Sequence, residues 1–167
     1  MAADKHGNEF FPIAFLGTET LIVRPGESAK PKVITAVTEL DAEGKTVIIT
    51  DSYLFESFGD PDYKDEILDV LLSLKAKKII YTSYAGKGEK AVRDPVIAAL
   101  LAQGCTVEYK TAKIHDRYWF CLETNKAIAM NSYNGIGKRT SSIFTLDEQD
   151  KKDLRADFIA QGIIIDD

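Results

Sequence analysis

Hydrophobic positions along this chain alternate between short continuous runs and amphipathic stretches with helical spacing. Thr46–Thr50 is a nearly continuous apolar run, which is typical of a strand buried on both faces. Further along, the apolar residues from Ile67 to Leu74 recur at i, i+3, i+4 and i+7, which predicts an amphipathic helix. The two patterns together predict strands that alternate with helices.

The same patterns extend over the chain from residue 10 onward, and the first two strands are expected to form a hairpin around Gly17. Strands are predicted at Phe10–Leu16, Thr20–Val23, Thr46–Thr50, Lys78–Thr82, Thr106–Lys110, Tyr118–Leu122, Ala127–Met130 and Ser141–Leu146. Helices are predicted from Pro31 to about Leu40, after Asp60-Pro61, from Asp94-Pro95 to Gln103, and over Asp147–Ala160. This order predicts an α/β fold whose mixed, largely parallel sheet carries helices on both faces.

Composition limits the classes of protein to which the chain can belong. Its 167 residues, 45% hydrophobic and 28% charged, predict one globular domain over residues 11–167 after a flexible lead-in at 1–10. We expect no membrane span and a cytoplasmic location, because no apolar run approaches about 18 residues and the N-terminus lacks an apolar signal core. The net charge of −5 argues against a protein that coats nucleic acid but leaves local phosphate binding open.

Two polar clusters in the last third of the chain carry residue types that are able to do chemistry. His115 and Arg117 stand where one predicted strand begins, and Ser132 and Asn134 stand where the next strand ends. If residues 118–122 and 127–130 pair as a hairpin, the start of one strand lies beside the end of the other. Because side chains alternate along an extended chain, all four would then converge at one end of the sheet.

These four residues suit a phosphate site that contains a nucleophile. The imidazole of His115 can attack phosphorus and form a covalent intermediate. The guanidinium of Arg117 can hold the non-bridging oxygens, while Ser132 and Asn134 supply further hydrogen-bonding groups. This chemistry requires no metal ion and no cofactor. Cys105 and Cys121 are isolated in the sequence and are interpreted as buried thiols.

Structural roles remain open for the same four residues. His115 alone at the start of a strand is often structural, Arg117 can pair with a neighbouring carboxylate such as Asp116, and Ser132 and Asn134 are common turn residues.

Other polar, aromatic and apolar residues are candidates for secondary roles. Asp51 and Tyr53 follow a central strand, where open α/β sheets bind ligands, and are candidates for the rim of the site. Lys138 is interpreted first as a solvated loop lysine, with a role as a ligand as the alternative. The aromatic group Tyr53, Phe55, Phe58 and Tyr63 is interpreted as core and interface rather than as a base-stacking platform, because the chain is acidic. The tail residues Ile163–Ile165 could form an edge strand, dock on the domain or belong to a partner interface.

The two polar clusters resemble the paired motif of a known enzyme superfamily. His115-Asp116-Arg117, followed by Asn131-Ser132-Tyr133-Asn134-Gly135, is similar to the H-x-K … G-S-x-N signature of the phospholipase D superfamily. It resembles short bacterial members that carry a single motif. The resemblance implies a phospholipase-D-like fold and a nucleophilic role for His115. It also implies a symmetric homodimer that brings two copies of this histidine together.

Departures from the motif leave two hypotheses. The motif's lysine is Arg117, its aspartate position is Leu122, and the glycine before Ser132 is Asn131. The first hypothesis is a metal-independent phosphodiesterase, acting on a nucleic acid or a lipid head group as a homodimer. The alternative is a catalytically degenerate module that binds a phosphate-bearing ligand or a protein partner in a bacterial system, such as one for defence against phage.

Overall fold

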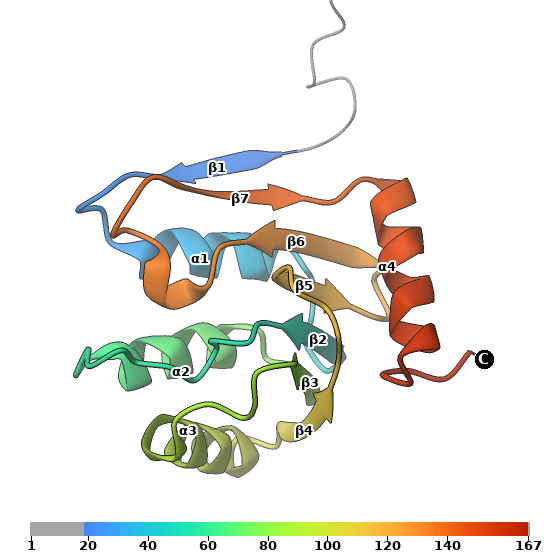
Figure 1. Cartoon of the computed structure of the whole chain (residues 1–167), viewed down its shortest axis with the longest axis horizontal. Coiled ribbons are helices and arrows are strands. Elements are labelled where there is room, and N and C mark those ends of the chain that lie inside the picture. Colours follow the sequence, from blue (N-terminus) through green and yellow to red (C-terminus); the bar gives the residue numbers. More distant parts are fainter. Residues whose placement is uncertain (1–18, 167) are drawn as a thin grey trace, which may run out of the picture.

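The apolar runs form the strands of one seven-stranded sheet. Figure 1 shows the structure, a computed structural model that describes residues 19–166. Its elements are β1 (Thr20–Val23), α1 (Ala29–Thr38), β2 (Thr46–Thr50), α2 (Tyr63–Ser73), β3 (Lys78–Ser83), α3 (Lys90–Ala102), β4 (Thr106–Thr111), β5 (Tyr118–Cys121), β6 (Lys126–Met130), the 3₁₀ helix Tyr133–Gly135, β7 (Ser141–Thr145) and α4 (Glu148–Ala160). None of the helices between residues 19 and 166 is long and apolar enough to cross a membrane.

The strand order is β1-β7-β6-β5-β2-β3-β4, and the sheet is mixed. Strands β2, β3 and β4 run parallel to one another, and every other neighbouring pair is antiparallel. The parallel part coincides with the strand–helix–strand units that the hydrophobic pattern predicts, because a parallel return needs a crossover connection. The expected mixed α/β fold is confirmed, but only two of the six strand pairs within the described residues are parallel, so the sheet is not largely parallel.

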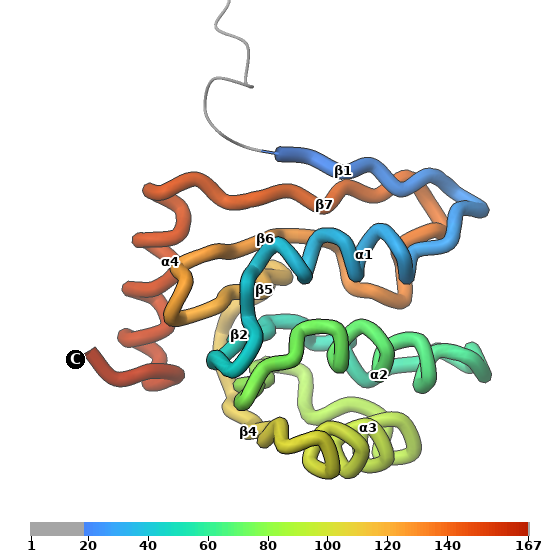
Figure 2. The backbone as a smooth tube through the Cα atoms, turned by 180° about the vertical axis from the view of Figure 1, so that it is seen from behind, coloured from blue at the N-terminus to red at the C-terminus, as the bar shows by residue number. Residues whose placement is uncertain are grey.

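Both faces of the sheet are covered, and alternate residues of each strand serve different faces. Val47 and Ile49 of β2 pack with α1, α2 and α3, whereas Ile48 belongs to a second core under α4. In that second core the ring of Phe120 meets the ring of Phe158 edge-on at 5.6 Å. Figure 2 shows α1, α2 and α3 side by side over the sheet.

The two cysteines are free and buried, as expected. Cys121 is fully inaccessible in the core under α1 to α3, and Cys105 is 5% exposed in the same core.

Helices α2 and α3, for which the sequence offers Asp-Pro start signals, do not begin at those signals. Asp60 does not cap α2; its carboxylate accepts a hydrogen bond from the amide of Asp62 and closes a turn before the helix. Helix α3 starts at Lys90, well before Asp94-Pro95, and Pro95 lies inside it. A proline in the second turn of a helix removes one donor, a loss that the packing of α3 against its neighbours tolerates.

Strand β1 pairs with a strand from the far end of the chain. Thr20–Val23 is a strand as predicted, and it pairs antiparallel with β7, with Thr20 opposite Phe144. The predicted partner strand Phe10–Leu16 and the turn at Gly17 lie outside the described residues, so the hairpin stays a prediction.

The isoleucine tail docks on its own domain and forms no strand within residues 161–166. Ile163 is 1% exposed in the core under α4, and its amide donates to the carbonyl of Phe158 at 2.8 Å. Ile165, by contrast, is 88% exposed. The sequence leaves three roles open for this tail, and docking is the one that Ile163 takes.

Substitution of these two isoleucines by alanine should therefore have unequal effects. We expect Ile163→Ala to lower the free energy of unfolding by about 2–4 kcal/mol, because it leaves a cavity in the second core. Ile165→Ala is the matched control and should change it by less than about 0.5 kcal/mol. Denaturant midpoints would measure both, and equal effects would contradict the docked tail.

Candidate functional site

The β5–β6 hairpin brings the two polar segments side by side, as the sequence predicts, but only Arg117 and Ser132 of the four predicted side chains touch. The amide of Met130, at the end of β6, donates to the carbonyl of Arg117 just before β5. The hydroxyl of Thr50, at the end of β2, accepts from the amide of Tyr118 and donates to the carbonyl of Asp116. Residues 116–118 are thus fixed at the carboxyl end of β2.

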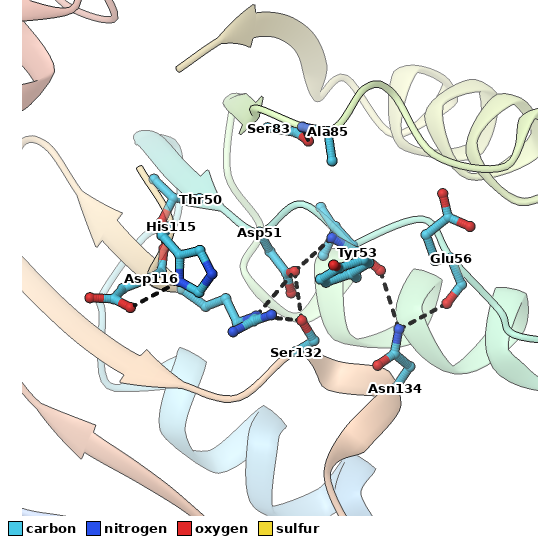
Figure 3. Close-up of polar contacts among 12 residues, drawn as sticks. Thr50, Asp51, Tyr53, Glu56, Ser83, Ala85, His115, Asp116, Ser132 and Asn134 are labelled. Carbon is cyan, nitrogen blue, oxygen red and sulfur yellow. Dashed lines mark hydrogen bonds and ion pairs between the residues drawn. The ribbon is translucent and has the colours of Figure 1, made fainter. Parts of the chain in front are cut away.

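Arg117, Ser132 and Asp51 form a hydrogen-bonded group at this end of the sheet. Nε of Arg117 donates to the hydroxyl of Ser132 at 2.5 Å, and this hydroxyl donates to Oδ1 of Asp51 at 2.8 Å. Nε also lies 3.7 Å from Oδ1 of Asp51. Figure 3 shows Ser132 and Asp51 facing each other from separate segments. Two predicted site residues, Arg117 and Ser132, therefore meet, and Asp51, which the sequence predicts for the rim, lies in contact with them.

Asp51 is a buried carboxyl group rather than a residue of an open rim. Its side chain is 2% exposed, and it accepts a hydrogen bond from the amide of Tyr53. Burial raises the pKa of Asp51, while the hydrogen bonds from Tyr53 and Ser132 and the charge of Arg117 act in the opposite direction. Three groups, the amide of Tyr53, the hydroxyl of Ser132 and the guanidinium of Arg117, therefore favour the ionised form of Asp51. The side chain of Arg117 is itself 25% exposed and open to a ligand.

His115 stands at the surface beside this group. Its side chain is 77% exposed, and Nδ1 lies 3.5 Å from a carboxylate oxygen of Asp116. The imidazole also stacks on the ring of Tyr84, with centroids 6.0 Å apart and an angle of 25° between the planes. Within residues 19–166 no hydrogen bond joins the imidazole to Arg117 or Ser132. The ring is accessible to a ligand from solution.

Asn134 is turned toward a neighbouring loop. The chain does not stay extended after Ser132, because Tyr133–Gly135 forms a 3₁₀ turn. As a result, the side-chain amide of Asn134 donates to the carbonyls of Glu56 at 3.0 Å and Tyr53 at 3.4 Å (Figure 3). Asn134 thus braces the loop that follows β2, a contact that alternation along an extended strand could not predict.

The remaining two predicted residues differ in their relation to the site. The ring of Tyr53 lies under the guanidinium of Arg117, with Cζ 5.5 Å from the ring centroid, so Tyr53 does border the site. Lys138 is exposed on the β6–β7 connection, and the hydrogen bonds of the described residues do not link it to the Arg117 group. Lys138 therefore stays a prediction.

A groove of about 790 Å³ runs past His115 and Arg117 and is closed on its other side by α4. The wall that α4 forms includes Asp150, Asp153 and Asp157. Sequence reasoning missed this wall, although the spacing of the three aspartates at i, i+3 and i+7 places them on one helical face. No set of three or more histidine, cysteine, aspartate or glutamate side chains within residues 19–166 is placed to hold a metal ion.

Comparison with known proteins identifies the fold. No protein-family model matches the sequence, and no curated protein matches it either. Among solved structures, Nuc from Salmonella typhimurium, a phospholipase D family member, has a TM-score of 0.52 at 11% identity, over 87% of this chain and 95% of its own. NucT from Helicobacter pylori has a TM-score of 0.50 at 13% identity, over 87% and 96%.

A polyphosphate kinase from Porphyromonas gingivalis has a TM-score of 0.53 at 10% identity. The match covers 89% of this chain but only 26% of the kinase, so the chain spans about a quarter of that protein. These likenesses show that the chain has a phospholipase-D-like α/β fold.

Proposed function

We propose that this chain is a metal-independent phosphodiesterase in which His115 is the nucleophile. The observation that carries the proposal is the contact between Arg117 and Ser132 beside an exposed imidazole. It lies at one end of a sheet whose fold matches that of a phospholipase D family member. An imidazole open to a ligand, next to a partly exposed guanidinium, is the minimum set for attack on a phosphodiester.

The reaction has two steps. Nδ1 of His115 faces Asp116, so Nε2 is the nitrogen that attacks phosphorus. The phosphorus–nitrogen bond forms as the bond from phosphorus to the leaving oxygen breaks, and Arg117 binds the non-bridging oxygens as negative charge develops on them. The leaving oxygen takes a proton. Water then attacks phosphorus, breaks the phosphorus–nitrogen bond and releases the second product with a free imidazole.

The proton for the leaving group comes from a second copy of the chain. Within residues 19–166 His115 is the only histidine, so we propose that the second histidine, the general acid, is His115 of another molecule. In a symmetric homodimer one His115 attacks phosphorus, while His115 of the second copy donates the proton to the leaving oxygen in the first step and takes a proton from the attacking water in the second. The active species is thus a homodimer with its two-fold axis beside the groove.

The direct test is turnover of phosphodiesters in EDTA. Single- and double-stranded DNA and RNA and a generic nitrophenyl diester would serve as substrates. We expect His115→Ala to lower the rate roughly a thousandfold or more, since a lost nucleophile removes the covalent route. The control is His6→Ala, which replaces the other of the two histidines. Turnover that survives His115→Ala would contradict the mechanism.

A second candidate function is binding without turnover. It is favoured by the engagement of Arg117 with Asp51 and of Asn134 with backbone carbonyls, which leaves fewer groups for a transition state. Such a module would capture a phosphate-bearing ligand or a protein partner. Sedimentation equilibrium separates the two functions: a monomer that binds a diester without cleaving it supports the binding module, and an active dimer supports the enzyme.

A further inference from the structure

Two groups of aromatic rings flank the candidate site on separate loops. Tyr84, on the β3–α3 loop, is 48% exposed and stacks on His115. On the loop that follows β2, the ring of Tyr53 contacts the guanidinium of Arg117 and packs at 6.0 Å against Phe58. The two residues that would bind the scissile phosphate thus each have a ring beside them.

The backbone of Phe58 has an unfavourable conformation, and its ring is not buried. Its φ of 50° lies in the left-handed region, which costs a non-glycine residue about 1–2 kcal/mol. The ring is 65% exposed, so it does not contribute to the core. Two other aromatic residues of the same segment, Phe55 and Tyr63, are buried as the sequence predicts. Phe58 is therefore not part of the core, and its predicted interface role is untested; an unfavourable backbone conformation at an exposed ring is a reason to look for a function there.

The loop that carries Phe58 is firmly anchored. The carboxylate of Glu89, at the start of α3, accepts hydrogen bonds from the amide and the hydroxyl of Ser57 and from the amide of Phe58. The hydrogen bond from the Ser57 hydroxyl is the largest cause that lowers the pKa of Glu89, and the amides of Ser57 and Phe58 act in the same direction. An ionised Glu89 therefore holds the loop in place and presents the Phe58 ring to solvent.

We propose that Tyr84 and Phe58 are stacking surfaces for unpaired bases. The substrate class is then a nucleotide phosphodiester with single-stranded bases, and not a lipid head group. Every base offers a flat π face to an aromatic ring, and such stacking contributes about 1–3 kcal/mol per base. Because the net charge is −5, we expect binding to rest on these rings and on Arg117 rather than on a broad basic surface. A duplex hides the base faces that these rings would bind.

The substrate class rests on the proposed function, but base stacking does not. The test therefore measures binding alone. A dinucleotide of 2-aminopurine and thymine, titrated with protein in EDTA, reports stacking as quenching of its fluorescence. We expect wild-type protein to quench it. Tyr84→Leu and Phe58→Leu should each weaken binding roughly tenfold, and Tyr84→Trp should retain it. The control Leu101→Ala removes an apolar side chain that is 59% exposed on α3 and should have no effect.

The outcomes separate the two proposals. Quenching without hydrolysis leaves the stacking surfaces in place and overturns the phosphodiesterase. Hydrolysis of methyl nitrophenyl phosphate without quenching of the dinucleotide supports the phosphodiesterase and overturns the stacking proposal. Quenching that neither leucine variant reduces also overturns the stacking proposal. So does dissociation of a homodimer by these variants, because the rings would then be contacts between protein copies.

Discussion

Arg117→Met should lower the free energy of unfolding by about 2–4 kcal/mol, although methionine fills much of the same space. The substitution leaves the carboxyl group of Asp51 buried at 2% exposure without its cation. It also removes the donor that orients Ser132, so the hydroxyl loses one of its two partners. Guanidinium chloride midpoints would measure the change. Arg139→Met, at an exposed position on the β6–β7 connection, is the matched control and should be neutral.

The double variant Arg117→Met with Asp51→Asn identifies the cause. If the uncompensated carboxylate is responsible, the neutral amide at position 51 should restore at least about 1 kcal/mol. A double variant no more stable than Arg117→Met would show that the loss comes from packing and would contradict the electrostatic account.

The same pair of residues predicts a dependence of stability on pH. Burial raises the pKa of Asp51 from its ordinary value of 3.8, so the folded protein binds this proton more tightly than the unfolded chain does. Stability then falls as pH rises from about 3.8 through the folded pKa, since the folded state binds more protons there. Arg117 opposes this effect in the wild type. We therefore expect the penalty of Arg117→Met to shrink as the pH falls, because Asp51 is then protonated and needs no cation.

Gly88→Ala should be the most damaging single-methyl substitution near the site. The residue has a φ of 80°, and an added Cβ would lie 2.7 Å from Cβ of Phe55 and 3.1 Å from its carbonyl oxygen. Phe55 is 1% exposed and its carbonyl accepts from the amide of Glu89, so neither atom can move easily. We expect a loss of about 3 kcal/mol, which lowers the melting temperature by roughly 6–12 °C.

Gly59→Ala is the control for this substitution. Its φ of 82° is nearly the same, but no heavy atom lies within 4 Å of the added Cβ. It should show only the left-handed backbone cost of about 1–2 kcal/mol. Calorimetry of both variants isolates the steric part. Equal losses would mean that the loops of Phe55 and Gly88 are not packed as described. Gly88→Ala should also reduce dinucleotide quenching, because Tyr84 and Phe58 lie on these two loops.

The pattern of apolar and polar residues predicts an element correctly where the side chains of that segment determine its structure. The continuous run Thr46–Thr50 and the hairpin of Tyr118–Cys121 with Lys126–Met130 could be predicted, since burial and the turn at Asn125 (φ 54°) fix them. Asp147 caps α4 through the amide of Asp150, again a local signal. By contrast, the pairing of β1 with β7 joins opposite ends of the described chain, and no short-range pattern encodes it.

The site was predictable in part for the same reason. Arg117 and Ser132 meet because the hairpin brings their segments together. Asp51 lies beside them because β2 pairs with β5 in the sheet. That pairing joins segments far apart in the sequence, so no local pattern predicts it. The turn at Tyr133–Gly135 redirects Asn134, and a Ser-x-Asn motif alone cannot distinguish that turn from an extended strand. The sequence could not show which ring of the aromatic group leaves the core: Phe58 is exposed, whereas Phe55 and Tyr63 are buried.

The covalent step is open to direct measurement. Protein mixed with a cleavable dinucleotide and quenched with alkali, which preserves phosphohistidine, can be digested and analysed by mass spectrometry. The account predicts that the retained nucleotidyl phosphate is found on the peptide that contains His115 and is absent from the His115→Ala protein. Turnover with no adduct on that peptide, or with the adduct on another residue, would contradict it.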